Sequence, residues 1–134
     1  MKRISIIAGA VALIAAAVLV GCNLFTAGLS VSYNGANIAY GSTHAVGTVS
    51  NPLTLTITNT GSNTLHITGN VTATPGAGSV AVSSISQPGS TTLAVNATTS
   101  FGINLASSGA FSLAVSIPND SGQNPFTFTV TGSH

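Results

Sequence analysis

Residues 52–58 read Pro-Leu-Thr-Leu-Thr-Ile-Thr, and this stretch decides the fold class. Leu53, Leu55 and Ile57 alternate with threonines without a break. Successive side chains of a β-strand point to opposite faces of a sheet, so the alternation predicts a strand with one buried apolar face and one hydroxyl face in solvent. We therefore expect Leu53, Leu55 and Ile57 in the core and the threonines between them outside.

The same two-residue period returns along the rest of the chain. It is clear at 101–105, 111–117 and 126–130, where large apolar residues alternate with small or hydroxyl residues. Glycine, proline and asparagine clusters separate these segments and are typical of turns. Weaker strands are expected at 29–33, 37–40, 65–68, 80–84 and 92–95.

Short strands between turns, with no helical period after residue 28, indicate an all-β fold. About seven to nine strands fit an immunoglobulin-like antiparallel β-sandwich in one domain, residues 29–134, and a small closed barrel is the alternative. The cysteine–tryptophan–cysteine pattern of antibody domains is absent, so the likeness is one of architecture. The turn chemistry of Asn59-Thr60-Gly61-Ser62, between strands 52–58 and 65–68, also predicts a hairpin there.

The first 21 residues predict an export signal. Met1-Lys2-Arg3 gives a positive start and contains every Lys and Arg of the chain. Residues 4–20 form an apolar run, and the small Gly21 ends it. This order describes a secretory signal peptide, residues 1–21. An uncleaved anchor helix is the alternative, because the run is near the roughly 20 residues that span a bilayer.

Leu19-Val20-Gly21-Cys22 resembles the bacterial lipobox, and Cys22 is the only cysteine. The resemblance implies a diacylglycerol thioether on Cys22, cleavage before Cys22, and usually a further acyl chain on the new amine. Residues 22–28 would then be the anchored cysteine and a short tether, while an ordinary free thiol is the alternative for Cys22. We expect an exported protein, lipid-anchored to the cell envelope, with the outer membrane favoured because Asn23 stands where an inner-membrane retention signal has aspartate.

A wider resemblance covers roughly residues 29–132. Ile57-Thr58-Asn59-Thr60-Gly61, the leucine strand at 65–69, Phe101 and the closing stretch 124–132 are similar to the choice-of-anchor D domains, within the HYDIN-type (ASH-type) immunoglobulin-like modules. The chain departs from that pattern at 95–97, where the family usually has a proline or glycine turn and this chain has Val-Asn-Ala. Asparagine also accepts a positive φ, so the turn is expected to survive. The resemblance implies a sandwich fold and a mostly non-catalytic envelope role.

Charge is nearly absent from the chain. It has two Lys or Arg residues and one Asp or Glu. Lys2 and Arg3 would leave with the signal peptide, so Asp120 would be the only member of this set after cleavage. Nucleic-acid binding is excluded, because no basic patch is available to neutralise phosphates. Anionic lipid head groups would likewise find no cationic partner.

The residues that could support catalysis or metal binding are few. Paired-carboxylate chemistry needs two acids, and the chain has only Asp120. His44 or His66 could serve a serine as a base, but no nucleophile-elbow motif accompanies them, and His44, His66 and His134 lack zinc-ligand spacing. We therefore expect no catalytic, cofactor or metal site. Asp120 should hydrogen-bond the backbone of its own turn, and His66 should be an exposed cross-strand residue.

These patterns favour a lipid-anchored cell-envelope protein that acts as a non-catalytic binding or adhesive module at the bacterial surface. A structural scaffold of the periplasm or outer membrane is the alternative, and a hydrolase comes third. The expected partners are the membrane, through acylated Cys22, and a protein or a second copy that adds to an edge strand, because the chain lacks the lysines that usually protect sheet edges. No nucleic acid and no small-molecule substrate is expected.

The lipobox generates the first testable prediction. Cys22→Ala should abolish lipidation and leave the precursor uncleaved, because both steps act at this thiol. Mass spectrometry of the membrane fraction should show a wild-type chain that begins at an acylated Cys22. A membrane-bound wild-type chain that keeps an unmodified Met1 would contradict this.

Overall fold

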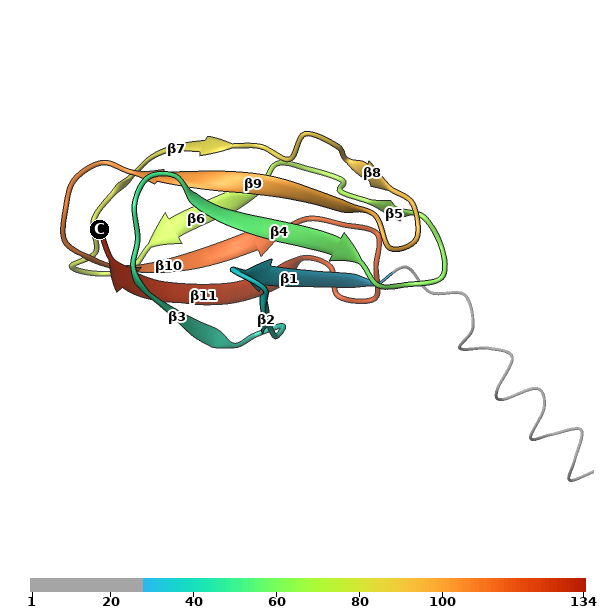
Figure 1. Cartoon of the computed structure of the whole chain (residues 1–134), viewed down its shortest axis with the longest axis horizontal. Helices are drawn as coiled ribbons and strands as arrows, with labels where there is room; N and C mark the ends of the chain where they lie inside the picture. Colours follow the sequence, from blue (N-terminus) through green and yellow to red (C-terminus); the bar gives the residue numbers. More distant parts are fainter. Residues whose placement is uncertain (1–27) are drawn as a thin grey trace, which may run out of the picture.

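The structure, a computed structural model, describes residues 28–134 (Figure 1). The expected signal helix at 1–21, the lipobox, Cys22 and the tether up to residue 27 lie outside the described residues.

The described part of the chain is all-β and contains eleven strands. Three of them, β2, β5 and β8, are only two or three residues long. The bounds are β1 (Leu29–Tyr33), β2 (Ala36–Ile38), β3 (Thr43–Thr48), β4 (Leu53–Asn59), β5 (Leu65–His66), β6 (Thr72–Pro75), β7 (Val82–Ser86), β8 (Thr92–Leu93), β9 (Thr98–Leu105), β10 (Ala110–Ile117) and β11 (Phe126–Ser133).

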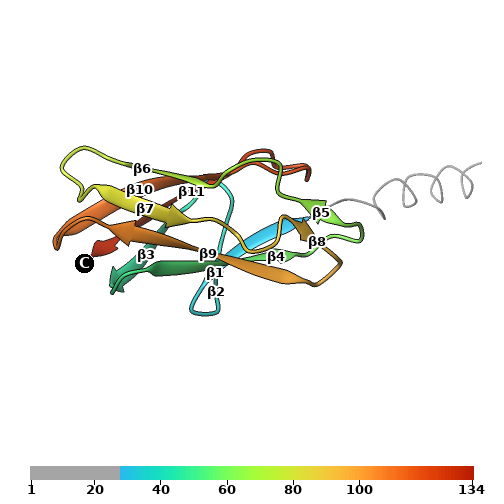
Figure 2. The same cartoon turned by 90° about the horizontal axis from the view of Figure 1, so that it is seen from above.

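Two sheets stack into a sandwich, which Figure 2 shows as two layers seen from above. One sheet has the order β2-β1-β4-β9-β7, the other has the order β3-β11-β10-β6, and β5 and β8 form a small separate pair. Strand pairing is antiparallel except where β3 runs parallel to β11. The orders β1-β4-β9-β7 and β6-β10-β11 are those of the immunoglobulin constant-type sandwich, ABED and CFG. The expected fold class is confirmed, and the barrel alternative is wrong because the two sheets stay separate.

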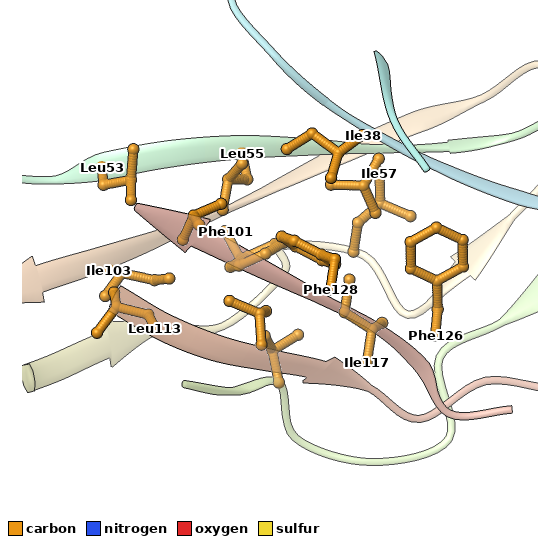
Figure 3. Packing of buried hydrophobic residues seen from close by; sticks show 14 of the residues in the cluster. Ile38, Leu53, Leu55, Ile57, Phe101, Ile103, Leu113, Ile117, Phe126 and Phe128 are labelled. Carbon is orange, nitrogen blue, oxygen red and sulfur yellow. The ribbon is translucent and has the colours of Figure 1, made fainter. Parts of the chain in front are cut away.

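The core lies between the two sheets and is built from their facing apolar side chains (Figure 3). Strands β1, β4, β9, β10 and β11 contribute alternate residues to it, so each sheet has one buried face and one solvent-facing (wet) face. Burying each large aliphatic or aromatic side chain contributes about 1.5–3 kcal/mol before the cost of ordering the chain. Those labelled in Figure 3 are Ile38, Leu53, Leu55, Ile57, Phe101, Ile103, Leu113, Ile117, Phe126 and Phe128.

Strand β4 has the register that the alternation predicts. Leu53, Leu55 and Ile57 are buried, whereas Thr54 is exposed and Thr56 is half-buried on the opposite face. β4 lies inside its sheet, with β1 on one side and β9 on the other. The predicted orientation of the central strand is therefore confirmed.

The predicted hairpin between 52–58 and 65–68 is wrong. β4 pairs with β1 and β9, while β5 pairs with β8 through Leu65↔Leu93 and His66↔Thr92. Both edges of β4 are already taken by longer strands, and longer strands supply more ladder hydrogen bonds and more buried apolar area. The alternation at 65–68 was a true strand signal, but it says nothing about which strand becomes the partner.

The weaker strand predictions need corrected boundaries. The segment expected at 37–40 is β2, Ala36–Ile38, and the one expected at 80–84 begins two residues later as β7, Val82–Ser86. The strands expected at 65–68 and 92–95 shrink to the two-residue β5 and β8. β3 and β6 were not predicted, because each is an edge strand whose apolar alternation is weak.

Asn59 is a fully buried amide that closes the turn after β4. Its Nδ2 donates to the carbonyl oxygens of Asn63 (2.8 Å) and Leu93 (2.9 Å), and its Oδ1 accepts the N–H of Gly61 (3.0 Å). These bonds satisfy backbone groups of the turn after β4 and of Leu93 in β8. The side chain thus holds the end of β4 against β8.

Asn119 is also fully buried, and it closes the turn after β10 in the same way. Its Nδ2 donates to Ile117 O and Gln123 O, both at 2.9 Å, and its Oδ1 accepts the N–H of Ser121 at 2.8 Å. Across the described residues, no buried side-chain nitrogen or oxygen is left without a hydrogen-bond partner. Polar groups at the ends of the sandwich are therefore satisfied by carboxamides.

The packing of β4 gives the second prediction. Leu55→Ala should destabilise the fold by about 2–5 kcal/mol, because it opens a cavity in the core. Thr56→Ala on the wet face should cost about 0.5 kcal/mol, since it removes one exposed bond to Ser100 (3.3 Å). Denaturant unfolding of both variants measures the difference, and equal losses would mean that β4 is buried on both faces.

Candidate functional site

The sequence-predicted site residues Leu19, Val20, Gly21 and Cys22 fall outside the described residues, so the lipid site stays a prediction. Within residues 28–134, no helix is long and apolar enough to cross a membrane.

The described residues contain one acid–base pair, His66 and Asp120. The Asp120 carboxylate binds His66 twice: Oδ1 accepts its backbone N–H at 2.8 Å, and Oδ2 lies 2.6 Å from Nδ1 of its ring. In return, the backbone N–H of Asp120 donates to the His66 carbonyl at 3.1 Å. The pair joins β5 to the β10–β11 connection, with the two side chains 51% and 39% exposed.

The hydrogen bonds fix the electrostatics of this pair. The backbone N–H of His66 is the main reason why the pKa of Asp120 lies below its usual value, and the His66 ring adds to that effect while partial desolvation opposes it. A carboxylate at Nδ1 favours the tautomer with its proton there, which leaves Nε2 as the free ring nitrogen when the imidazole is neutral. The pair could therefore present an oriented imidazole to solvent.

Sequence reasoning placed His66 correctly and Asp120 incorrectly. His66 is exposed on the polar face of β5, opposite Thr92, as expected. The main hydrogen bonds of the Asp120 carboxylate run to His66, 54 residues away, while Asn119 makes the turn bond to Ser121. The only sequence signal for the pair was that Asp120 is the single acid of the chain.

The His66 ring nitrogen Nδ1 lies within hydrogen-bonding distance of the Asp120 carboxylate, which holds the ring in one orientation. The described residues contain no group of three His, Cys, Asp or Glu side chains that could hold a metal ion. His134 instead lies with its Nδ1 3.2 Å from Ser107 O at the other end of the sandwich.

The wet face of β6, β10 and β11 carries a shallow hollow of about 290 Å³. Ala114 is short and lies across from Thr74 and Thr129, and this leaves space among β-branched neighbours. The walls of the hollow combine threonine and serine with apolar residues and carry no charged side chain, so an uncharged group would match it. Its lining is Gly41, Thr72, Thr74, Ala114, Val115, Ser116, Thr127, Phe128 and Thr129.

The sheet edges at β2, β6 and β7 are protected by geometry, although the described residues contain no lysine. β2 is three residues long, β6 ends at Pro75, and β7 has an irregular register between Val82 and Ser84. Short edges, prolines and bulges all hinder the addition of another strand. β3 is the longest edge strand and pairs regularly with β11 over Thr43–Ala45, before the register shifts between Thr131 and Gly132 of β11.

No protein-family model and no curated protein matches the chain. Among solved structures, it is similar to the VesB protease of Vibrio cholerae (16% identity, TM-score 0.43, covering 72% of this chain and 31% of that one). It is also similar to the secreted serine protease VesC from Vibrio cholerae (18% identity, TM-score 0.47, covering 86% of this chain and 24% of that one).

These matches correct one expectation. We expected a non-catalytic binding or adhesive module with a scaffold as the alternative, and we ranked a hydrolase last, but both similar structures are proteases. The assignment as a non-catalytic module is therefore withdrawn. This chain matches less than a third of each protease, and at this similarity protease activity remains a property of those two proteins.

The His66–Asp120 pair gives the third prediction. Because its pKa is lowered on folding, Asp120 should contribute stability that is present above the ordinary aspartate pKa, about 3.9, and is lost as the pH falls through the lower folded value. Asp120→Asn should remove this acid-dependent loss. Unfolding midpoints measured across this pH range check it, and the chain has no other Asp or Glu side chain to confuse the result. Equal acid dependence of the wild type and Asp120→Asn would show that the pair is not the cause.

Proposed function

We propose that this chain is an exported envelope protein, held at the membrane by acyl chains on Cys22, whose β3 edge accepts an extended segment of a partner protein or of a second copy. The proposal combines the lipobox pattern with the geometry of the one long edge.

The observation that carries the proposal is the direction of the backbone groups in β3. In a parallel ladder, alternate residues of a strand turn both of their backbone groups toward the same neighbour. The carbonyl of Ser42 accepts the N–H of Thr129 in β11 at 2.8 Å. The register Thr43↔Thr129 then directs the backbone groups of Thr43 and Ala45 away from the sheet.

The side chains of this edge do not obstruct an incoming strand. Thr43 and Ala45 are exposed and small, and His44 between them is half-buried. No Lys, Arg, Asp or Glu lies in β3 or in β11 beside it. Main-chain hydrogen bonds along such an edge supply affinity in strand addition, and alternate side chains supply selectivity.

The absence of charge also sets the conditions of recognition. Long-range steering needs charge, and salt screens it within about 8 Å at physiological ionic strength. A partner of this edge would therefore be found without steering and held by short-range hydrogen bonds. Its affinity should change little between low and moderate salt.

A photo-crosslinking experiment in living cells gives the fourth prediction. A benzophenone side chain at position 43 should form a protein adduct, and Ala45→Pro should reduce its yield because proline removes an outward donor. One lost hydrogen bond corresponds to about fivefold in affinity. Ala45→Ser keeps the donor and serves as the matched control.

The same probe at position 54 controls for random capture, because β4 is paired on both sides. Equal adduct yields at positions 43 and 54, or a steep loss with added salt, would overturn the proposal. Melting of the Ala45→Pro variant should stay near that of the wild type, since the Ala45 N–H does not serve the β11 ladder.

A further inference from the structure

We infer that the end of the sandwich from which β1 starts rests on the lipid surface, with the turn at Val95 touching the bilayer. This inference rests on the proposed lipid anchor at Cys22 and names the surface that the anchor would place against the membrane. The contact would be with uncharged lipid, and it would fix the orientation of the β3 edge.

The tether between an acylated Cys22 and the sandwich would be short. Six residues, Asn23 to Gly28, separate Cys22 from the start of β1. Fully extended, they reach about 20 Å. Gly28 is itself fixed to the sandwich, because its carbonyl accepts the N–H of Thr60 at 3.1 Å. The end of the domain that carries Gly28 therefore cannot move far from an acylated Cys22.

Three loops lie at the end of the sandwich that carries Gly28. Figures 1 and 2 both place the start of β1 at the same end as β5 and β8, with the C-terminus at the opposite end. The turn 59–63, the turn 94–97 and the connection 118–125 lie there, and Asn59 joins the first two through backbone hydrogen bonds to Asn96 and Ala97. These loops carry one charged side chain, Asp120, and His66 already occupies its carboxylate.

Val95 lies on one of these loops, and backbone hydrogen bonds hold that loop in place. Val95 is 46% exposed and is one of two large hydrophobic residues that are exposed in the described chain. After Val95, Asn59 N donates to Ala97 O and Asn96 N donates to Asn59 O, both at 3.0 Å, and before it Asn59 Nδ2 donates to Leu93 O at 2.9 Å. Asn96 takes φ 64°, which closes the turn. The valine side chain is thus held out of the core.

An apolar tip, at an end whose one charged side chain is the Asp120 carboxylate bound by His66, fits a lipid surface better than it fits water. Without a cationic side chain, these loops gain nothing from anionic head groups, so neutral lipid should serve equally well. A single valine would not hold the domain by itself. The tether supplies a high local concentration, so that even a weak contact stays occupied.

The test uses the full lipidated chain in phosphatidylcholine vesicles. Acylation blocks Cys22, so Val95→Cys introduces the only free thiol, which is labelled with an environment-sensitive fluorophore. Ser108→Cys, exposed at the opposite end, is the matched control on the same tether. We expect quenchers attached to the lipids to reduce emission from position 95 severalfold more than from position 108, equally with and without anionic lipid.

Each outcome decides something different. If the chain does not float with the vesicles, both the anchor and the contact are overturned. If it floats but positions 95 and 108 are quenched alike, the contact is wrong while the anchor stands. Quenching at 95 only when anionic lipid is present would also overturn the inference, because the end would then be using charge. Far-UV circular dichroism of both labelled variants should match the wild type.

Discussion

The whole structure depends on one constraint. Each strand buries one face in the core, and uncharged side chains must cover its solvent-facing side. The chain meets the first demand with alternate leucine, isoleucine, valine and phenylalanine, which pack between the two sheets. It meets the second with threonine and serine, whose β-branched or small side chains suit a pleated surface. Long charged side chains, which usually cover the wet faces of sheets, are absent from the described residues. The side chains on the two wet faces are therefore short and uncharged, and they lie close to the backbone.

The lack of charge also changes how the ends of the sandwich are held. Backbone groups at loops need partners when they are buried, and here side-chain amides supply them. Asn59 and Asn119 each satisfy three backbone groups at one end of the sandwich. At the other end, Asn51 bonds both backbone groups of Leu105, at 2.8 and 2.9 Å. A carboxamide both donates and accepts, so it can replace a missing strand neighbour where a carboxylate or an ammonium could not.

Asp120 is the only Asp, Glu, Lys or Arg side chain in residues 28–134, and it lies at the same end as two of these amides. Asp120 ties the short β5 to the β10–β11 connection, and it leaves the His66 ring oriented with one nitrogen free. The pair resembles half of a catalytic apparatus in geometry, yet its hydrogen bonds hold a loop in place. It braces this end of the sandwich through a contact between residues 54 positions apart in the chain.

The sequence by itself determined the β class, the two faces of β4, β9, β10 and β11, and the left-handed turn at Asn96, because each depends on residues that are neighbours in the chain. Only the tertiary structure decided the partners: β5 beside β8, β3 parallel to β11, and His66 on Asp120. Alternation tells which face of a strand is buried, but every strand with the same period is an equally good neighbour on that evidence. The choice among them is made by packing two whole sheets at once, and no local pattern contains that information.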